Sequence, residues 1–209
     1  MGKAHIENFD DEKQLLTEKL KLFTDCKKII YCADEDLVAE TISKQFSDKE
    51  LLTWSRKKNA TLQVVCEEQK KTTTHIQYKY QDKTHKIEVP FSNKASVNNV
   101  LTCCLAAHSL GLSKEAIAKG VATLEPVAMR LEIKEGLNNC VLINDCYNSD
   151  LGALEIALDT INRQQKNQQK TVILSDIYQT GYSKKKLYEK VANLLQQKKI
   201  DRLIGIGME

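Results

Sequence analysis

The amino-acid sequence predicts an α/β protein made of two partial domains, residues 1–127 and 128–209. Between residues 62 and 89, apolar residues recur with period two, which is typical of antiparallel strands with one solvated face. After residue 140, short apolar strands alternate with helical segments, which predicts parallel strands joined by crossovers. Pro126 interrupts the helical pattern between these two regions, so we expect the boundary close to it.

In the first domain, we expect a mixed sheet with an antiparallel meander. Residues 10–24 have apolar positions at helical spacing behind an acidic first turn, which predicts a helix. A buried strand follows at 28–32, and the run Asp34-Glu35-Asp36 is expected to cap a helix over 37–46. Further strands are expected at residues 51–55, 62–66, 74–80 and 84–89, and further helices at 96–110 and 113–124.

The second domain is expected to be Rossmann-like, with parallel strands in the order β-α-β-α-β. Its strands are predicted at 140–143, 171–174 and 202–206, and its helices at 151–163 and 184–197. Ligands of such sheets bind outside the carboxyl ends of the strands. Polar residues that directly follow these strands are therefore candidates for a site.

Composition excludes several classes of protein. A net charge of +3 is too weak to indicate binding to nucleic acid. No run approaches the roughly 18 apolar residues that span a bilayer, so no membrane span is expected. The 7 cysteines are odd in number and form no Cys-x-x-Cys, which argues against a disulfide framework or a zinc site. A reducing cytoplasm is the expected location.

The most informative stretch combines an arginine, an apolar strand and an Asp-x-Tyr-Asn turn: Pro126-Val-Ala-Met-Arg130-Leu-Glu132, residues 140–143, and Asn144-Asp145-Cys146-Tyr147-Asn148-Ser149. Such an arrangement places a cation and a carboxylate near a nucleotide in α/β enzymes. Its order and spacing resemble the Mur ligases, the ATP-dependent enzymes that build the peptide of bacterial peptidoglycan. The resemblance is closest to the branch that joins D-alanyl-D-alanine to a UDP-N-acetylmuramoyl-peptide through an acyl phosphate.

The resemblance implies roles for four residues of the second domain. Arg130 resembles the catalytic arginine at the domain junction, which reaches the ATP phosphates and neutralises charge on the transferred group. Asp145 resembles the carboxylate that accepts the ribose hydroxyls. Tyr147 and Asn148 complete the pattern and are expected to border the nucleotide or the incoming amino acid.

In the first domain, the resemblance covers His5 and Asn99. The segment around His5 is similar to the family segment whose histidine helps to hold Mg²⁺ beside the γ-phosphate, which implies a metal and catalytic role. Asn99 resembles the second asparagine of His-Asn-x-x-Asn, whose amide matches the adenine edge. Ala95 and Ser96 stand where the family has the histidine and the first asparagine.

The residues alone leave structural alternatives open. Arg130 could pair with Glu132 or Glu125, Asp145 could cap a helix, and Asn99 could belong to a polar cluster at a helix N-terminus. The remaining histidines have no partners at ligand spacing and are expected to be structural: His75, His85 and His108.

One motif of the family is missing from these 209 residues. They contain no Gly-x-x-x-x-Gly-Lys-Ser/Thr, the loop that holds nucleotide phosphates. We therefore expect the chain to be a fragment that is inactive by itself, from a ligase that resembles versions fused to an alanine racemase. Two alternatives remain: a non-catalytic nucleotide-binding or interaction module, and a structural α/β domain.

Overall fold

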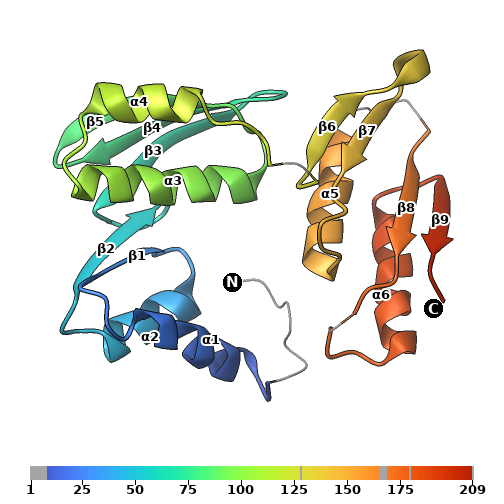
Figure 1. Cartoon of the computed structure of the whole chain (residues 1–209), viewed down its shortest axis with the longest axis horizontal. Coiled ribbons are helices and arrows are strands. Elements are labelled where there is room, and N and C mark those ends of the chain that lie inside the picture. Colours follow the sequence, from blue (N-terminus) through green and yellow to red (C-terminus); the bar gives the residue numbers. More distant parts are fainter. Residues whose placement is uncertain (1–8, 128, 165–168, 179, 209) are drawn as a thin grey trace. The chain divides into compact units, whose positions relative to one another are not determined.

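The computed structural model describes residues 9–127, 129–164, 169–178 and 180–208 (Figure 1). The chain divides into two compact units, one over Leu16–Glu125 and the other over Pro126–Glu209. Each unit has an apolar core of its own. The α/β class predicted from the sequence is confirmed.

Unit 1 contains a five-stranded mixed sheet whose spatial order follows the chain. Its strands are β1 (Lys28–Cys32), β2 (Glu50–Ser55), β3 (Leu62–Gln69), β4 (Thr74–Tyr80) and β5 (Lys83–Val89). The pairs β1–β2 and β2–β3 are parallel, whereas β3–β4 and β4–β5 are antiparallel. Burial alternates along β4, as its period-two pattern predicts. The mixed sheet and its antiparallel meander are therefore both present.

Two helical layers cover the sheet of unit 1 on opposite faces. The helices are α1 (Glu12–Leu20), continued by the 3₁₀ turn η2 (Lys21–Phe23), then α2 (Asp36–Gln45), α3 (Lys94–Ser109) and α4 (Lys114–Ala122). Ile29 of β1 packs in a cluster with residues of α1 and α2, whereas its neighbour Ile30 packs against the cluster of α3 and α4. Because successive strand side chains point to opposite faces, the two helix pairs cover different faces.

Helix α3 is the central helix of the larger core. The side chain of Asn93 caps it by accepting a hydrogen bond from the Ser96 N–H at 2.8 Å. Its buried residues recur at helical spacing and form one apolar stripe: Val97, Val100, Leu101, Cys104, Leu105 and His108. The exposed residues of the helix lie away from this stripe and include Asn99 and Cys103.

The expected cap of α2 is wrong. Glu35 occupies the N-cap position of this helix without a side-chain hydrogen bond to it. Asp34 instead accepts hydrogen bonds from Ser55 Oγ and from the Arg56 N–H. The reason is that Asp34 follows β1 and Ser55 ends its parallel neighbour β2, so both lie at one edge of the sheet.

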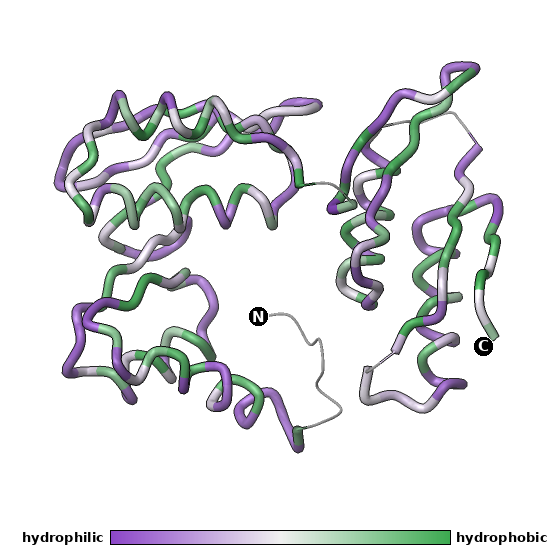
Figure 2. Tube along the Cα trace, viewed as in Figure 1, coloured by the Kyte–Doolittle hydropathy of each residue, from purple (hydrophilic) through white to green (hydrophobic). Residues whose placement is uncertain are grey.

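Unit 2 contains two small sheets and two helices. Its elements are β6 (Glu132–Glu135), the 3₁₀ turn η3 (Leu137–Asn139), β7 (Val141–Asn144), α5 (Leu151–Gln164), β8 (Thr171–Ser175), α6 (Lys184–Gln197) and β9 (Arg202–Ile206). One core cluster joins α5, β8 and α6, and includes Leu158, Val172 and Val191. Hydrophobic and hydrophilic segments alternate along α5 and α6 in Figure 2, as expected of helices with one buried side.

The predicted order of strands and helices in unit 2 is confirmed, but the pairing of the first strand differs. Strands β8 and β9 are parallel, whereas β7 pairs antiparallel with β6, a strand that the sequence pattern did not reveal. Asn138 and Asn139 turn the chain between β6 and β7 with φ of 56° and 59°. Such a short connection closes a local hairpin at little entropic cost. Three of the four residues of β6 are exposed, so no apolar period marked it.

Candidate functional site

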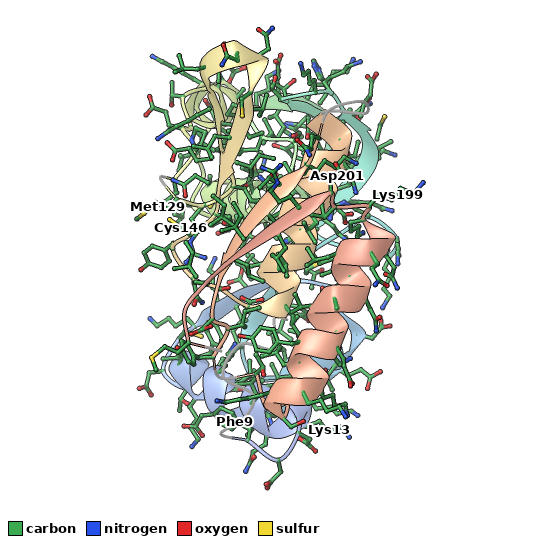
Figure 3. All side chains as sticks on the ribbon, turned by 90° about the vertical axis from the view of Figure 1, so that its right-hand side faces the viewer. Phe9, Lys13, Met129, Cys146, Lys199 and Asp201 are labelled. Atoms are coloured by element: carbon green, nitrogen blue, oxygen red, sulfur yellow. The ribbon has the colours of Figure 1, made fainter. Side chains whose placement is uncertain are left out.

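Arg130 and Asp145 lie at the same end of the β6–β7 hairpin. The register pairs Glu132 with Asn144, so the residues just before β6 stand opposite those just after β7. The Leu131 N–H donates a hydrogen bond to Asp145 Oδ1 at 3.0 Å, which continues this pairing beyond the strands. Figure 3 labels Met129 and Cys146 near one another at this end of the hairpin.

The guanidinium of Arg130 lies over the ring of Tyr147. The distance from Cζ to the ring centroid is 4.2 Å, which is well within the range of a cation–π interaction. The Tyr147 N–H donates to the carbonyl of Met129 at 3.3 Å, so the backbone also holds the two segments together. Both side chains are exposed. Arg130 is thus oriented without being buried.

The backbone on either side of Arg130 adopts an uncommon conformation. Met129 and Leu131 have φ of 58° and 49°, in the left-handed region that residues with a Cβ rarely enter. Conformations of this kind are strained and cluster at functional sites. Their position beside Arg130 supports a site at this end of the hairpin.

Opposing effects act on the Asp145 carboxyl. Burial raises its pKa above the ordinary value, while the hydrogen bond from Leu131 and the charge of Arg130 act in the opposite direction. Asp150 contributes a further increase through its negative charge. The net result is a raised pKa for a half-buried carboxylate, in spite of the positive charge of Arg130.

The structure does not show the alternative roles of Arg130 as an ion-pair partner of a glutamate and of Asp145 as a helix cap. Glu132 accepts a hydrogen bond from Asn144 Nδ2 at 3.2 Å and pairs with Lys134 at 3.0 Å. Within the described part of the chain, no ion pair involves Arg130. The carboxylate that caps α5 belongs to Asp150, which accepts from the Ala153 N–H at 2.9 Å, and not to Asp145.

Two other predicted site residues, Asn148 and Asn99, are exposed. Asn148 follows Tyr147 and is exposed. Asn99 is an exposed residue of α3 in unit 1, whereas its neighbour Asn98 faces the sheet and contacts Arg56. Helix α3 is capped by Asn93, so Asn99 does not serve as the cap.

His5 lies outside the described residues, and its predicted metal role is not tested. Among the residues that are described, no three His, Cys, Asp or Glu side chains come together as a metal site. The described helices include none with the length and apolarity to cross a bilayer.

Sequence reasoning missed a polar cluster around Arg56 in unit 1. Burial raises the pKa of Asp34, but hydrogen bonds from Ser55 and from the backbone of Arg56 and Lys57 outweigh it, so the net pKa is lowered. The Arg56 side chain extends from this turn to Glu67 and Asn98. The positions of Asp34 and Arg56 after two neighbouring strands could have indicated this cluster, because carboxyl ends of parallel strands share an edge.

The fold and the site define an α/β protein with a cation and a carboxylate at one end of a hairpin. Residues 1–107 match the family model of the Mur ligase middle domain. The chain therefore belongs to the Mur ligase family.

Individual relatives and solved structures agree with this assignment. The UDP-N-acetylmuramoyl-tripeptide--D-alanyl-D-alanine ligase of Bacillus subtilis is 24% identical over 99% of this chain and 44% of its own length. Thus the chain spans less than half of this curated relative. MurF from Acinetobacter baumannii superposes with a TM-score of 0.82 at 20% identity, over 99% of this chain and 45% of the other. MurF from Thermotoga maritima in complex with ADP gives 0.76 at 16% identity, over 98% and 46%. At these identities the two structures show the fold.

Proposed function

We propose that this chain forms the later part of the ATP-binding domain and the first part of the C-terminal domain of a peptidoglycan-precursor ligase. The proposed reaction joins D-alanyl-D-alanine to a UDP-N-acetylmuramoyl-peptide in the cytoplasm. In it, the γ-phosphoryl group of ATP passes to the peptide carboxylate, and the amine of D-alanyl-D-alanine then displaces phosphate. The name of the Bacillus subtilis relative supports this pair of substrates.

The observation that carries the proposal is the arrangement of Arg130 and Asp145. The hydrogen bond from Leu131 occupies Asp145 Oδ1, and no described residue donates to Oδ2. This second oxygen suits a ribose hydroxyl. Arg130 is exposed, oriented by Tyr147 and without an ion pair among the described residues, so its guanidinium suits a phosphate oxygen.

The residues of this chain would bind and orient the nucleotide and neutralise charge on its phosphates. Arg130 would hold phosphate oxygens and offset the charge that develops during transfer. Asp145 would accept a ribose hydroxyl, and Asn99 would pair with the adenine edge. Tyr147 and Asn148 would border the nucleotide or the incoming amino acid.

The requirement for Mg²⁺ is also a proposal, with His5 as one of its ligands. The resemblance of the His5 segment to the family supports it. When bound, Mg²⁺ would supply positive charge beside the γ-phosphate. No other ligand is assigned.

We further propose that the 209 residues do not catalyse ligation by themselves, because they contain no phosphate-binding Gly-x-x-x-x-Gly-Lys-Ser/Thr loop. Peptide-bond formation by this chain alone would contradict this statement. A fusion to an alanine racemase stays a prediction from the Asp-Cys-Tyr-Asn-Ser-Asp segment, and the coding sequence around the chain tests it.

An ATP-analogue titration tests the site in the complete protein that contains this chain. Arg130→Ala and Asp145→Ala are each expected to weaken binding by about tenfold or more, since charged hydrogen bonds are worth about 1.5–3 kcal/mol. Unchanged affinity and turnover in both variants would show that Arg130 and Asp145 do not form the nucleotide site. Binding without any ligation would favour the non-catalytic nucleotide-binding module instead.

A further inference from the structure

Arg56 connects three elements of unit 1 through one guanidinium. It follows β2, and its Nε donates to Glu67 Oε2 of β3 at 2.7 Å. Its Nη1 donates to Asn98 Oδ1 of α3 at 2.9 Å. The guanidinium also lies 5.2 Å from the centroid of the Trp54 ring. A planar group with several donors can make these contacts at once, whereas a lysine cannot.

The turn that carries Arg56 is itself fixed. Ser55 is fully buried, and its hydroxyl donates to Asp34 while accepting from the N–H groups of Lys57 and Lys58. The Arg56 N–H donates to Asp34 Oδ2 at 2.9 Å. The guanidinium therefore extends from a rigid turn.

A second contact holds the same face of α3 one turn later. The Trp54 indole N–H donates to Thr102 Oγ1 at 2.9 Å, and Thr102 lies four residues after Asn98. Arg56 and Trp54 thus hold two successive turns of α3 against the sheet. Asn99 is the next residue after Asn98, about 100° further around the helix, and it is exposed.

We propose that Arg56 is a positioning residue for the adenine end of the nucleotide site. By fixing Asn98 toward the sheet, it sets the rotation and height of the first turns of α3 and hence the place of the Asn99 amide. This inference rests on the proposed function, in which Asn99 pairs with adenine. In this proposal Arg56 acts through Asn98 and is not itself a nucleotide ligand.

Fold stability alone is a poor explanation for this arginine. Arg56 Nη2 is buried and has no hydrogen-bond partner among the described residues, which opposes stability. An apolar side chain would pack against Trp54 without that penalty, although it would leave Glu67 and Asn98 without this donor. A group that holds Glu67 and Asn98 in fixed directions is better explained by preorganisation of a site.

Steady-state kinetics of the complete protein with ATP and GTP test this proposal. Arg56→Gln and Asn98→Ala are each expected to raise the KM for ATP about tenfold and to lower the preference for ATP over GTP similarly, with kcat within about twofold. Arg56→Lys should recover part of the loss. Lys58→Gln removes a nearby exposed cation that pairs with Asp36, and it should leave every parameter unchanged.

The outcomes separate the inference from the function on which it rests. A lowered thermal midpoint with unchanged KM and nucleotide preference would overturn the role of Arg56. Should Arg56→Gln fail to fold, Asn98→Ala, which removes one of the two polar contacts, decides alone. If Asn99→Ala keeps its preference for ATP, the adenine role of Asn99 is wrong. If Asn99→Ala loses that preference while the Arg56 and Asn98 variants keep it, only the positioning inference fails.

Discussion

Leu131 and Asp145, 14 residues apart in the chain, are joined by a hydrogen bond of 3.0 Å from the Leu131 N–H to Asp145 Oδ1. The same carboxyl senses the charge of Arg130, which lowers its pKa, while burial raises it. One side chain therefore closes the end of the β6–β7 hairpin and presents a carboxylate beside a guanidinium. The two tasks can be separated by substitution.

The first prediction compares Asp145→Asn with Asp145→Ala. Because the pKa of Asp145 is raised in the folded protein, its ionisation opposes folding: the stability it contributes is present in acid and is lost as pH rises through the folded pKa. Asp145→Asn keeps an acceptor for Leu131 without the charge. It should be at least as stable as the parent at pH 7, and this difference should vanish below about pH 4.

Asp145→Ala leaves the Leu131 N–H without its acceptor and should lower the free energy of unfolding by about 1 kcal/mol. Urea titrations followed by far-ultraviolet circular dichroism measure both variants. Equal destabilisation by Asn and Ala at pH 7 would contradict this account. Both variants should still bind an ATP analogue more weakly than the parent.

The second prediction concerns the ring that lies against Arg130. Tyr147→Phe keeps the aromatic face and should bind an ATP analogue as the parent does. Tyr147→Leu should bind about two- to fivefold more weakly, since exposed cation–π contacts are worth about 0.5–1 kcal/mol. Titration of the complete protein at low ionic strength measures the difference. A loss shared by Phe and Leu would instead assign the effect to the phenolic hydroxyl.

The third prediction uses two glycines at the end of the chain's last strand. Gly207 has φ of +143°, and a Cβ there would clash with the carboxylate of Asp176. That carboxylate accepts hydrogen bonds from the Met208 N–H at 3.0 Å and from the Tyr178 hydroxyl at 3.1 Å, so it cannot move freely. Gly207→Ala should therefore destabilise unit 2 by about 1–3 kcal/mol.

Gly205 provides the matched control, because a Cβ at this position meets nothing within 4 Å. Gly205→Ala should be neutral or slightly stabilising. Amide hydrogen exchange of β8 and β9 reports the effect locally. Equal protection of these amides in Gly207→Ala and Gly205→Ala would show that the Asp176 side chain moves aside without destabilising unit 2.

Most secondary structure was predictable because apolar period and turn residues mark it. The strand at Arg202–Ile206 and the helix at Lys184–Gln197 have the predicted bounds. Strand β6 escaped because it has neither a buried face nor a long apolar run. Its pairing with β7 depends on the Asn138–Asn139 turn, and hydrophobic periodicity does not predict which strands pair.

The candidate site was predictable only through the order of residues in a motif. Arg130, Asp145 and Tyr147 come together because a hairpin joins their segments, and no apolar period marked the first strand of that hairpin. The Arg56 cluster was missed for a related reason. Its contacts to Glu67 and Asn98 link residues 11 and 42 positions away, and no local pattern connects them.

The last prediction concerns acid sensitivity of unit 1. Four rings lie together there: Tyr78, Tyr80, His85 and His108. The Tyr78 hydroxyl and His108 Nε2 share a hydrogen bond of 3.0 Å. Burial lowers the pKa of His108, and the neighbouring His85 lowers it further. The expected structural role of His108 therefore has a physical basis: the fold favours the neutral form of its imidazole.

A histidine whose pKa is lowered on folding contributes stability that is present above its ordinary pKa of about 6.5 and is lost as pH falls toward the folded value. Unit 1 should therefore lose stability between pH 7.5 and 5.5, by at most about 1.4 kcal/mol per pH unit for one proton. His108→Gln should flatten this dependence. Trp54, the single tryptophan and a buried residue of the same core, reports the unfolding of unit 1 by fluorescence.

The exposed His75 supplies the control, and His75→Gln should retain the pH dependence of stability. A slope that survives in His108→Gln would show that the acid sensitivity of unit 1 arises from other groups.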